Sequence, residues 1–200
     1  MSPAHTDGWN HNAHYHRHLL AAVPRPCARA LDVGCGLGTF ARRLSTIAET
    51  IDALDEQTGV IDRARGLSVH VPNVRFVHAD FMTWAAAGKY DFISMIAVLH
   101  HLPFREALTK AATLLEPGGV LAVLGLDRAP SLGHAAARSV MAYPVSAYYR
   151  VRLQTSAVGA PTREPTMTLA EISEQARSIL SKPIIRQHLL WRYSLIWTKS

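Results

Sequence analysis

Residues 31–40 read LDVGCGLGTF, and this stretch decides how the rest of the chain is interpreted. A short apolar run ends in an acid, Asp32, and glycines then occupy alternate positions at Gly34, Gly36 and Gly38. A glycine costs roughly 0.5–1 kcal/mol relative to alanine inside a helix or strand. The spacing therefore predicts a loop whose backbone turns sharply or is approached closely by another group.

Length and composition favour one domain spanning residues 1–200. The chain has 200 residues, of which 48% are hydrophobic, enough for one core. No stretch approaches about 18 uninterrupted apolar residues, and residues 1–20 lack the apolar centre of a signal peptide. We therefore expect a cytoplasmic protein without membrane insertion. The sequence leaves the oligomeric state open.

The net charge of +6 comes from the last third of the chain. Residues 1–127 carry 11 Lys and Arg against 12 Asp and Glu, whereas residues 128–200 carry 10 against 3. The basic residues are scattered and never form a run of five or six. This pattern favours a solvated surface, and no nucleic-acid partner is expected.

Short branched apolar runs alternate with stretches that suit helices. Strands are predicted at Ala30–Val33, Thr50–Leu54, Val74–His78, Tyr90–Ile96 and Val120–Leu126. Helices are predicted at Gly38–Ile47, Gln57–Ser68, Met82–Ala87 (the weakest) and Pro103–Leu115. Such alternation is typical of a doubly wound, Rossmann-like α/β fold with helices on both faces of a parallel sheet.

The last 33 residues add a helix and a hairpin. Thr168 followed by Glu171 has the spacing of a capping box, which predicts a helix start. The runs Ile184–Leu190 and Arg192–Thr198 are separated by a single residue, too few for a parallel crossover. We therefore predict a mostly parallel seven-stranded sheet with one antiparallel strand at an edge.

Two classes of ligand, dinucleotides and S-adenosylmethionine, bind at such a loop beside the first strand of a parallel sheet. The spacing of the glycines distinguishes them. A dinucleotide fingerprint reads G-x-G-x-x-G/A, and its third small position here is Thr39. A β-branched side chain there should hinder close packing of helix and strand. The observed G-x-G-x-G behind an acid favours S-adenosylmethionine, which has no phosphate.

On these residues the chain resembles the class I S-adenosylmethionine-dependent methyltransferases, particularly the small-molecule branch similar to ubiquinone-biosynthesis methyltransferases. Four further segments between residues 30 and 126 carry the resemblance: IDALDEQ (51–57), HADF (78–81), YDFISMIAVLHHL (90–102) and LLEPGGVLAV (114–123). HNAHYHRHLL (11–20) is similar to the helix that closes over the cofactor in this family. The resemblance implies S-adenosylmethionine as the cofactor and S-adenosylhomocysteine as its product.

The resemblance also implies a set of cofactor residues. Asp55 would accept from the ribose hydroxyls, Asp80 would accept from the adenine amino group, and Phe81 would lie against the ring. The full set is Tyr15, Asp32, Gly34, Cys35, Gly36, Asp55, Glu56, Asp80, Phe81 and Ile96. The residues alone leave alternatives open: Asp32 could only brace the loop, Asp55 could cap a helix from Gln57, and Asp80 could be a solvated loop acid. Cys35 is interpreted as a small packing residue rather than a reactive thiol.

The acceptor side is less determined by the sequence. His101 and His100 follow the predicted fourth strand, and either could act as a general base or only cap the next helix. His101 is favoured by its match to the family. The Asn/Asp-Pro-Pro-Tyr tetrapeptide of adenine- and glutamine-directed enzymes is absent, which favours a small-molecule acceptor. His11, His14 and His18 lack a completing acid pattern, so no metal site is expected.

The domain is expected to divide into a cap-helix region (1–29), a cofactor core (30–126), a substrate lid (127–167) and a terminal helix with a hairpin (168–200). The aromatic segment 131–152 would roof the acceptor. We expect methyl transfer by in-line displacement to an O, N or C nucleophile. A non-catalytic adenosylmethionine-binding module acting through a protein partner remains the alternative, with a nicotinamide-dependent oxidoreductase as a third hypothesis.

Overall fold

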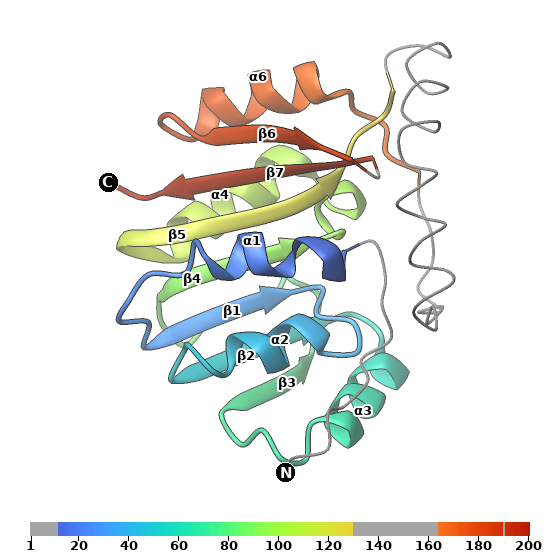
Figure 1. Cartoon of the computed structure of the whole chain (residues 1–200), viewed down its shortest axis with the longest axis vertical. Helices are drawn as coiled ribbons and strands as arrows, with labels where there is room; N and C mark the ends of the chain where they lie inside the picture. Colours follow the sequence, from blue (N-terminus) through green and yellow to red (C-terminus); the bar gives the residue numbers. More distant parts are fainter. Residues whose placement is uncertain (1–11, 130–163, 190) are drawn as a thin grey trace.

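A twisted seven-stranded sheet forms the centre of the computed structural model, which describes residues 12–129, 164–189 and 191–200 (Figure 1). The strands lie in the order β3-β2-β1-β4-β5-β7-β6. Their bounds are β1 Arg29–Val33, β2 Thr50–Asp55, β3 Val74–His78, β4 Tyr90–Ile96, β5 Leu115–Leu126, β6 Ile184–His188 and β7 Arg192–Thr198. The predicted Rossmann-like, mostly parallel sheet is thereby confirmed.

The antiparallel strand is β7. It pairs antiparallel with β5 on one side and with β6 on the other, while β1 to β5 pair in parallel. The connection from β6 to β7 is too short for a crossover, so the two strands form the predicted hairpin. Since β6 lies outside β7, the antiparallel strand is one position in from the edge of the sheet.

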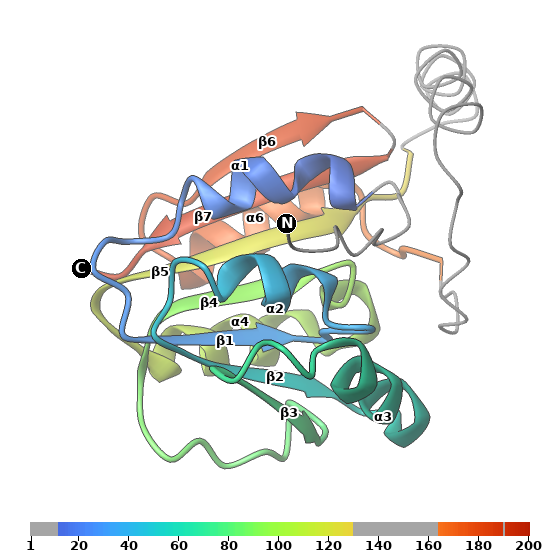
Figure 2. The ribbon, with the colours of Figure 1, turned by 60° about the horizontal axis from the view of Figure 1, so that its bottom comes forward.

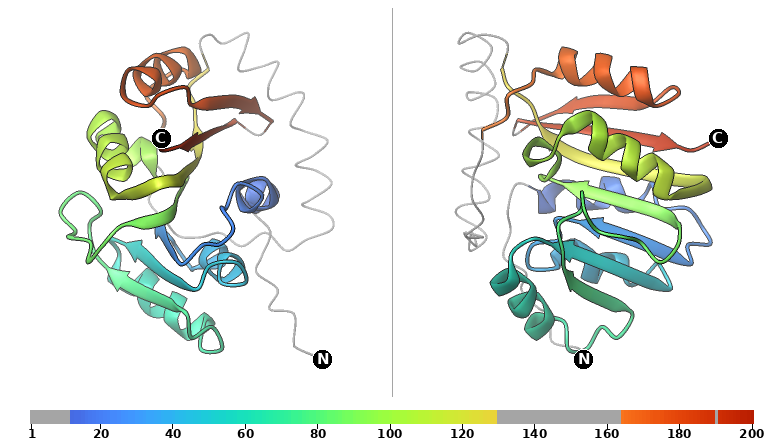
Figure 3. Two further views of the ribbon diagram at one scale, coloured as in Figure 1. Left: turned by 90° about the vertical axis from the view of Figure 1, so that its left-hand side faces the viewer. Right: turned by 180° about the vertical axis from the view of Figure 1, so that it is seen from behind.

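Helices cover both faces of the sheet (Figures 2 and 3). One face carries η1 Ala13–Tyr15, α1 His16–Leu20, α2 Thr39–Leu44 and α3 Thr58–Leu67. The other carries η2 Leu99–His101, α4 Phe104–Leu114 and α6 Leu169–Ile179. Each face has its own apolar cluster. The inner strands are buried on both sides and therefore read as nearly continuous apolar runs.

The capping box predicted at the start of α6 is present. The Thr168 backbone N–H donates to Glu171 Oε2 at 2.7 Å, and the Glu171 N–H donates to Thr168 Oγ1 at 3.4 Å. These two bonds satisfy backbone donors that a helix start leaves without intrahelical partners. Helix α6 therefore begins at the residue the sequence indicates.

The helix predicted at Met82–Ala87 is wrong. Residues 81–83 form a single turn, in which the Trp84 N–H donates to the Asp80 carbonyl at 2.8 Å. The carbonyls of Met82 and Trp84 then accept from Lys110 Nζ, at 3.0 and 2.7 Å. A lysine from α4 therefore takes two carbonyls that a continuing helix would have bonded to its own amides.

Strand β5 begins at Leu115, five residues before the predicted start. Leu115 pairs with Tyr90, and the register then shifts so that Phe92 pairs with Val120. Gly118 in this bulge has φ +79°, a left-handed conformation that glycine adopts without strain. Residues 115–119, which lie before the predicted strand, are therefore an irregular part of the strand itself.

Most of the predicted lid, including segment 131–152, lies outside the described residues. Its two described ends are hydrogen-bonded to each other. The Arg128 N–H donates to the Met167 carbonyl at 2.8 Å, and Arg128 and Thr168 form an isolated parallel β-bridge. Within the described ranges, no helix is long and apolar enough to cross a membrane.

Candidate cofactor and acceptor site

The glycine loop after β1 holds three left-handed glycines, each with a different neighbour. The φ angles of Gly34, Gly36 and Gly38 are +68°, +53° and +76°. A Cβ on Gly34 would lie 2.5 Å from a methyl of Val98, and one on Gly38 would lie 2.6 Å from the Phe76 ring. At Gly36 a Cβ would meet nothing within 4 Å. The chain itself packs on the outer two glycines, and the middle one faces open space.

Asp55 ties this loop to the end of β2. Its Oδ2 accepts from the Gly36 N–H at 3.0 Å, and its Oδ1 accepts from the Gln57 N–H at 3.0 Å. The carboxylate thus braces the loop and also bonds the backbone just before α3, as the alternative interpretation expected. A carboxylate offers about four accepting positions. Because Asp55 is only half-buried, roughly two positions stay available for the hydroxyls of a ribose.

Asp32 is buried beneath the loop, with 2% of its surface exposed. Ser94 Oγ of β4 donates to its Oδ1 at 2.7 Å, while Oδ2 has no hydrogen-bond partner among the described residues. Burial raises the pKa of Asp32 to about 7, a rise that the Ser94 bond opposes and the charge of Asp55 assists. A buried carboxylate directly before the glycine loop would favour a cationic ligand such as S-adenosylmethionine at that loop.

Asp80 and Phe81 follow β3 but face different surroundings. Asp80 is exposed, and its Oδ1 accepts from the Met82 N–H at 2.8 Å. Phe81 is only 4% exposed and packs in the apolar cluster on the α4 side, with Lys110 Nζ 5.3 Å from its ring centroid. This packing shows Phe81 supporting the loop from within the core, and its contact with adenine stays a prediction.

Three other expected cofactor residues lie around the loop. Cys35 is buried in the apolar cluster on the α2 side, and its N–H donates to the Leu54 carbonyl at 2.8 Å. Burial, with the charges of nearby carboxylates, raises the pKa of its thiol far above the usual range, as suits a packing residue. Glu56 is exposed, and Ile96 is half-buried at the end of β4.

Tyr15, the remaining expected residue, contacts the C-terminal hairpin. Its hydroxyl donates to the Leu189 carbonyl at 2.9 Å, and its ring lies 4.9 Å from that of His188. Nearby, His18 Nε2 and His188 Nε2 lie 3.3 and 2.7 Å from Ser194 Oγ. The polar face of the N-terminal helix is therefore docked on β6 and β7, which the sequence did not indicate.

Of the three histidines considered as metal ligands, only His14 and His18 lie within the described residues. His11 lies outside the described residues, and no cluster of metal-ligating side chains is found in the part of the chain that is described. His18 instead contacts the hairpin, as above.

A small pocket of about 50 Å³ lies at the carboxyl ends of β4 and β5, on the α4 and α6 side. His100 lines it, and the ring of His101 lies 4.1 Å from that of His100. Among the described residues the wall is otherwise apolar except for Thr166 and Tyr193. The lining residues are Leu99, His100, Leu102, Phe104, Leu126, Pro165, Thr166, Met167, Ile172 and Tyr193.

Known proteins resemble this chain along almost all of its length. The model of the methyltransferase domain family matches residues 30–119. The chain is 32% identical over 191 residues to an uncharacterized methyltransferase, Rv0089, of Mycobacterium tuberculosis, covering 94% of this chain and 96% of that protein. This chain is a class I S-adenosylmethionine-dependent methyltransferase.

Two further comparisons give the methyltransferase its context. It is 31% identical over 119 residues to the ubiquinone biosynthesis O-methyltransferase of Xanthomonas campestris, covering 57% of this chain and 49% of that protein. Its fold matches the N-methyltransferase NodS of Bradyrhizobium japonicum, solved in complex with S-adenosyl-L-homocysteine, with a TM-score of 0.66 and 18% identity. That alignment covers 98% of this chain and 91% of NodS.

The methyltransferase also has features that the sequence did not reveal. Ala97, directly after β4, has φ +54°, and its N–H donates to the Leu124 carbonyl at 2.7 Å. A residue with a Cβ in the left-handed region is strained, and such strain gathers at functional sites. The next residue, Val98, packs on Gly34. Of the residues that contact the site, Ser94 could have been noticed in the sequence, because it is a polar residue in the middle of an apolar strand and bonds Asp32.

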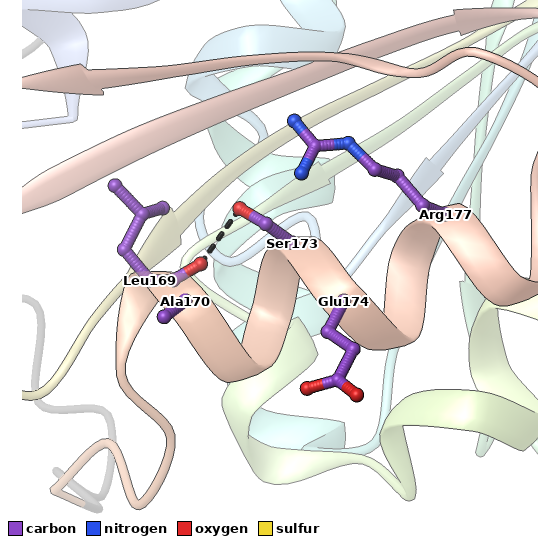
Figure 4. Close-up of a pocket in the computed structure, with 5 residues that line it drawn as sticks. All are labelled: Leu169, Ala170, Ser173, Glu174 and Arg177. Atoms are coloured by element: carbon purple, nitrogen blue, oxygen red, sulfur yellow. Dashed lines mark hydrogen bonds between the residues drawn. The ribbon is translucent and has the colours of Figure 1, made fainter.

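A second hollow of the methyltransferase lies along helix α6 (Figure 4). The lining residues that the structure describes come from this one helix: Leu169, Ala170, Ser173, Glu174 and Arg177. Ser173 Oγ donates to the Leu169 carbonyl at 2.7 Å. Among the described residues no second element contributes polar groups to this hollow, and the candidate site is therefore not placed here.

Proposed function

We propose that this methyltransferase transfers a methyl group from S-adenosylmethionine to a small molecule by in-line displacement. The observation that carries the proposal is the meeting of Gly36, Asp55 and the orphaned oxygen of Asp32 at one edge of the sheet. The names of similar proteins support a small acceptor, since one is a ubiquinone biosynthesis O-methyltransferase.

In this proposal the chain contributes binding and alignment. S-adenosylmethionine, when bound, supplies a methyl group activated by a sulfonium. Asp55 accepts from the ribose hydroxyls, and Asp32 accepts from the cationic part of the cofactor. Gly36 leaves the room that a side chain would fill. Such alignment removes much of the entropic cost of bringing the reacting atoms to about 3 Å.

The acceptor is proposed to enter the pocket at the ends of β4 and β5. His100 lines this pocket, and His101 stacks beside it. A histidine is neutral often enough near pH 7 to accept a proton from an oxygen or nitrogen nucleophile. The assignment of the base to His101 stays a prediction, and the pocket gives His100 an equal claim.

Calorimetry with S-adenosylhomocysteine tests the cofactor part. Asp55→Ala should weaken binding about 30- to 150-fold, because a carboxylate that accepts from two hydroxyls contributes about 2–3 kcal/mol. Asp62→Ala on the exposed face of α3 is the matched control and should bind like the wild type. Absence of binding to the folded wild-type protein, or equal binding by all three, would refute this part.

Turnover of the two histidine variants tests the acceptor part. His100→Gln or His101→Gln should lower turnover by roughly 10²–10⁴ if the replaced residue is the base, with cofactor affinity within about threefold of the wild type. Cofactor binding without transfer to any of a panel of phenols, amines and carboxylates would support a non-catalytic binding module instead.

A further inference from the structure

Tyr193 of β7 is a buried tyrosine at the pocket that the sequence did not single out. It is 2% exposed and lines the pocket together with His100. No hydrogen bond joins its hydroxyl to a described residue, and its oxygen is not among the fully buried atoms without a partner. A tyrosine hydroxyl at a pocket without a partner among the described residues can donate to a molecule bound there.

The fold holds the ring of Tyr193 in one place. Gly125 of β5 pairs with it across the sheet, and a Cβ on Gly125 would lie 2.4 Å from ring atoms. The ring therefore fills the space where any other residue at 125 would place its side chain. On the far side, Arg128 fixes the pocket wall, since its N–H bonds the Met167 carbonyl and its Nε bonds the Thr166 carbonyl at 3.0 Å.

The pocket lies one short helix away from the glycine loop. Val98 packs on Gly34, and the next two residues, Leu99 and His100 of η2, line the pocket. A molecule in the pocket is therefore close to the end of the loop where the cofactor is proposed to bind. The volume of about 50 Å³ admits only a few heavy atoms, which is the end of a molecule rather than its whole body.

The surroundings of the pocket favour a neutral group. Asp127, buried directly after β5, lies near Tyr193. Burial and the negative charge of Asp127 raise the pKa of the Tyr193 phenol well above its usual range. Tyr193 is therefore a neutral hydrogen-bond donor at physiological pH. A carboxylate entering the pocket would lose its hydration to a lining that is mostly apolar among the described residues.

We infer that Tyr193 and His100 bind a neutral hydroxyl at the end of an otherwise apolar acceptor, with Tyr193 donating to its oxygen. This inference rests on the proposed function, because it names the acceptor class of the same site. The apolar walls contact the ring or chain that carries the hydroxyl, and Tyr193 distinguishes that hydroxyl from a methyl group or a carboxylate.

Three probes of similar shape test the inference: phenol, toluene and benzoate. Each is titrated by NMR into the full-length protein saturated with S-adenosylhomocysteine. The wild type should bind phenol about three- to tenfold more tightly than toluene, the effect of one hydrogen bond, and benzoate most weakly. Tyr193→Phe should lose most of the preference for phenol over toluene, with its affinity for toluene unchanged, because only His100 then remains to contact the hydroxyl.

Tyr90→Phe is the matched control. Tyr90 is equally buried in the same sheet, but its hydroxyl donates to Asp52 Oδ2 at 2.7 Å, away from the pocket. This variant should lose stability and keep the preference for phenol. Tyr193→Phe should instead melt near the wild type, because it removes a hydroxyl that bonds no described residue.

Equal binding of phenol and toluene by the wild type would overturn the inference. So would a Tyr193→Phe protein that melts lower and still prefers phenol, since the hydroxyl would then be structural. Failure of the proposed function is a separate result: S-adenosylhomocysteine would not bind, and the same probes titrated into the protein alone would still report on the pocket.

Discussion

Replacing Asp32 by asparagine should change how the free energy of unfolding depends on pH. Two buried groups control this dependence, an acid whose pKa is raised and a base whose pKa is lowered. Burial raises the pKa of Asp32 to about 7, from 3.8 for a free side chain. Burial, helped by the charge of Arg43, lowers the pKa of His16 to about 3, from 6.5. His16 packs edge-on against Phe40, and its Nδ1 has no hydrogen-bond partner among the described residues.

The two groups act in opposite directions over nearly the same pH range. Between about pH 3.8 and 7, native Asp32 holds a proton that the unfolded chain has lost, so stability falls as the pH rises. Between about pH 3 and 6.5, the unfolded chain holds a proton that native His16 lacks, so stability rises. Each slope is about 1.4 kcal/mol per pH unit. In the wild type the two contributions cancel between about pH 4 and 6.5.

Asp32→Asn leaves only the contribution of His16. From pH 4.5 to 6.5, its free energy of unfolding should rise by about 3 kcal/mol relative to the wild type. His16→Gln should show the opposite, a fall of about 3 kcal/mol over the same range. Urea unfolding followed by circular dichroism at several pH values measures both. Curves for the wild type and Asp32→Asn that run parallel would refute the assignment of a raised pKa to Asp32.

Two further predictions concern the backbone. Gly36→Ala should cost roughly 1–2 kcal/mol, the penalty of a left-handed alanine, and Gly34→Ala should cost clearly more because its Cβ also meets Val98. Equal melting temperatures for the two variants would contradict the packing of Val98 on the loop. Thr168→Ala should lower the melting temperature by roughly 2–4 °C through loss of the helix cap, whereas Glu171→Gln, which keeps a capping box, should melt near the wild type.

The sequence predicted the sheet well because the inner strands are nearly continuous apolar runs bounded by residues that end them. The bounds of β3, β4 and β7 agree with those expected from the sequence. The parts that failed depend on contacts distant in the chain. Lys110 takes the carbonyls of Met82 and Trp84, and no local pattern reveals that a lysine some 26 residues away ends the helix.

The candidate site was predictable to a similar extent. The glycine loop and Asp55 lie where the motif places them, because both are set by the ends of parallel strands. The sequence could not show that Phe81 points into the core or that Tyr193 lines the pocket. Tyr193 is brought there by the antiparallel pairing of β7 with β5, which depends on the whole sheet.

The docking of helix α1 on the C-terminal hairpin has a consequence for the order of folding. The hydroxyl of Tyr15 and the carbonyl of Leu189 that it bonds are 174 residues apart in the chain. At roughly 5–20 residues per second, a ribosome makes the hairpin roughly 10–35 s after the helix. Helix α1 therefore spends that interval without its contacts to the hairpin, whereas Leu19 and His16 belong to packing around Phe40 whose buried residues are all made before the hairpin.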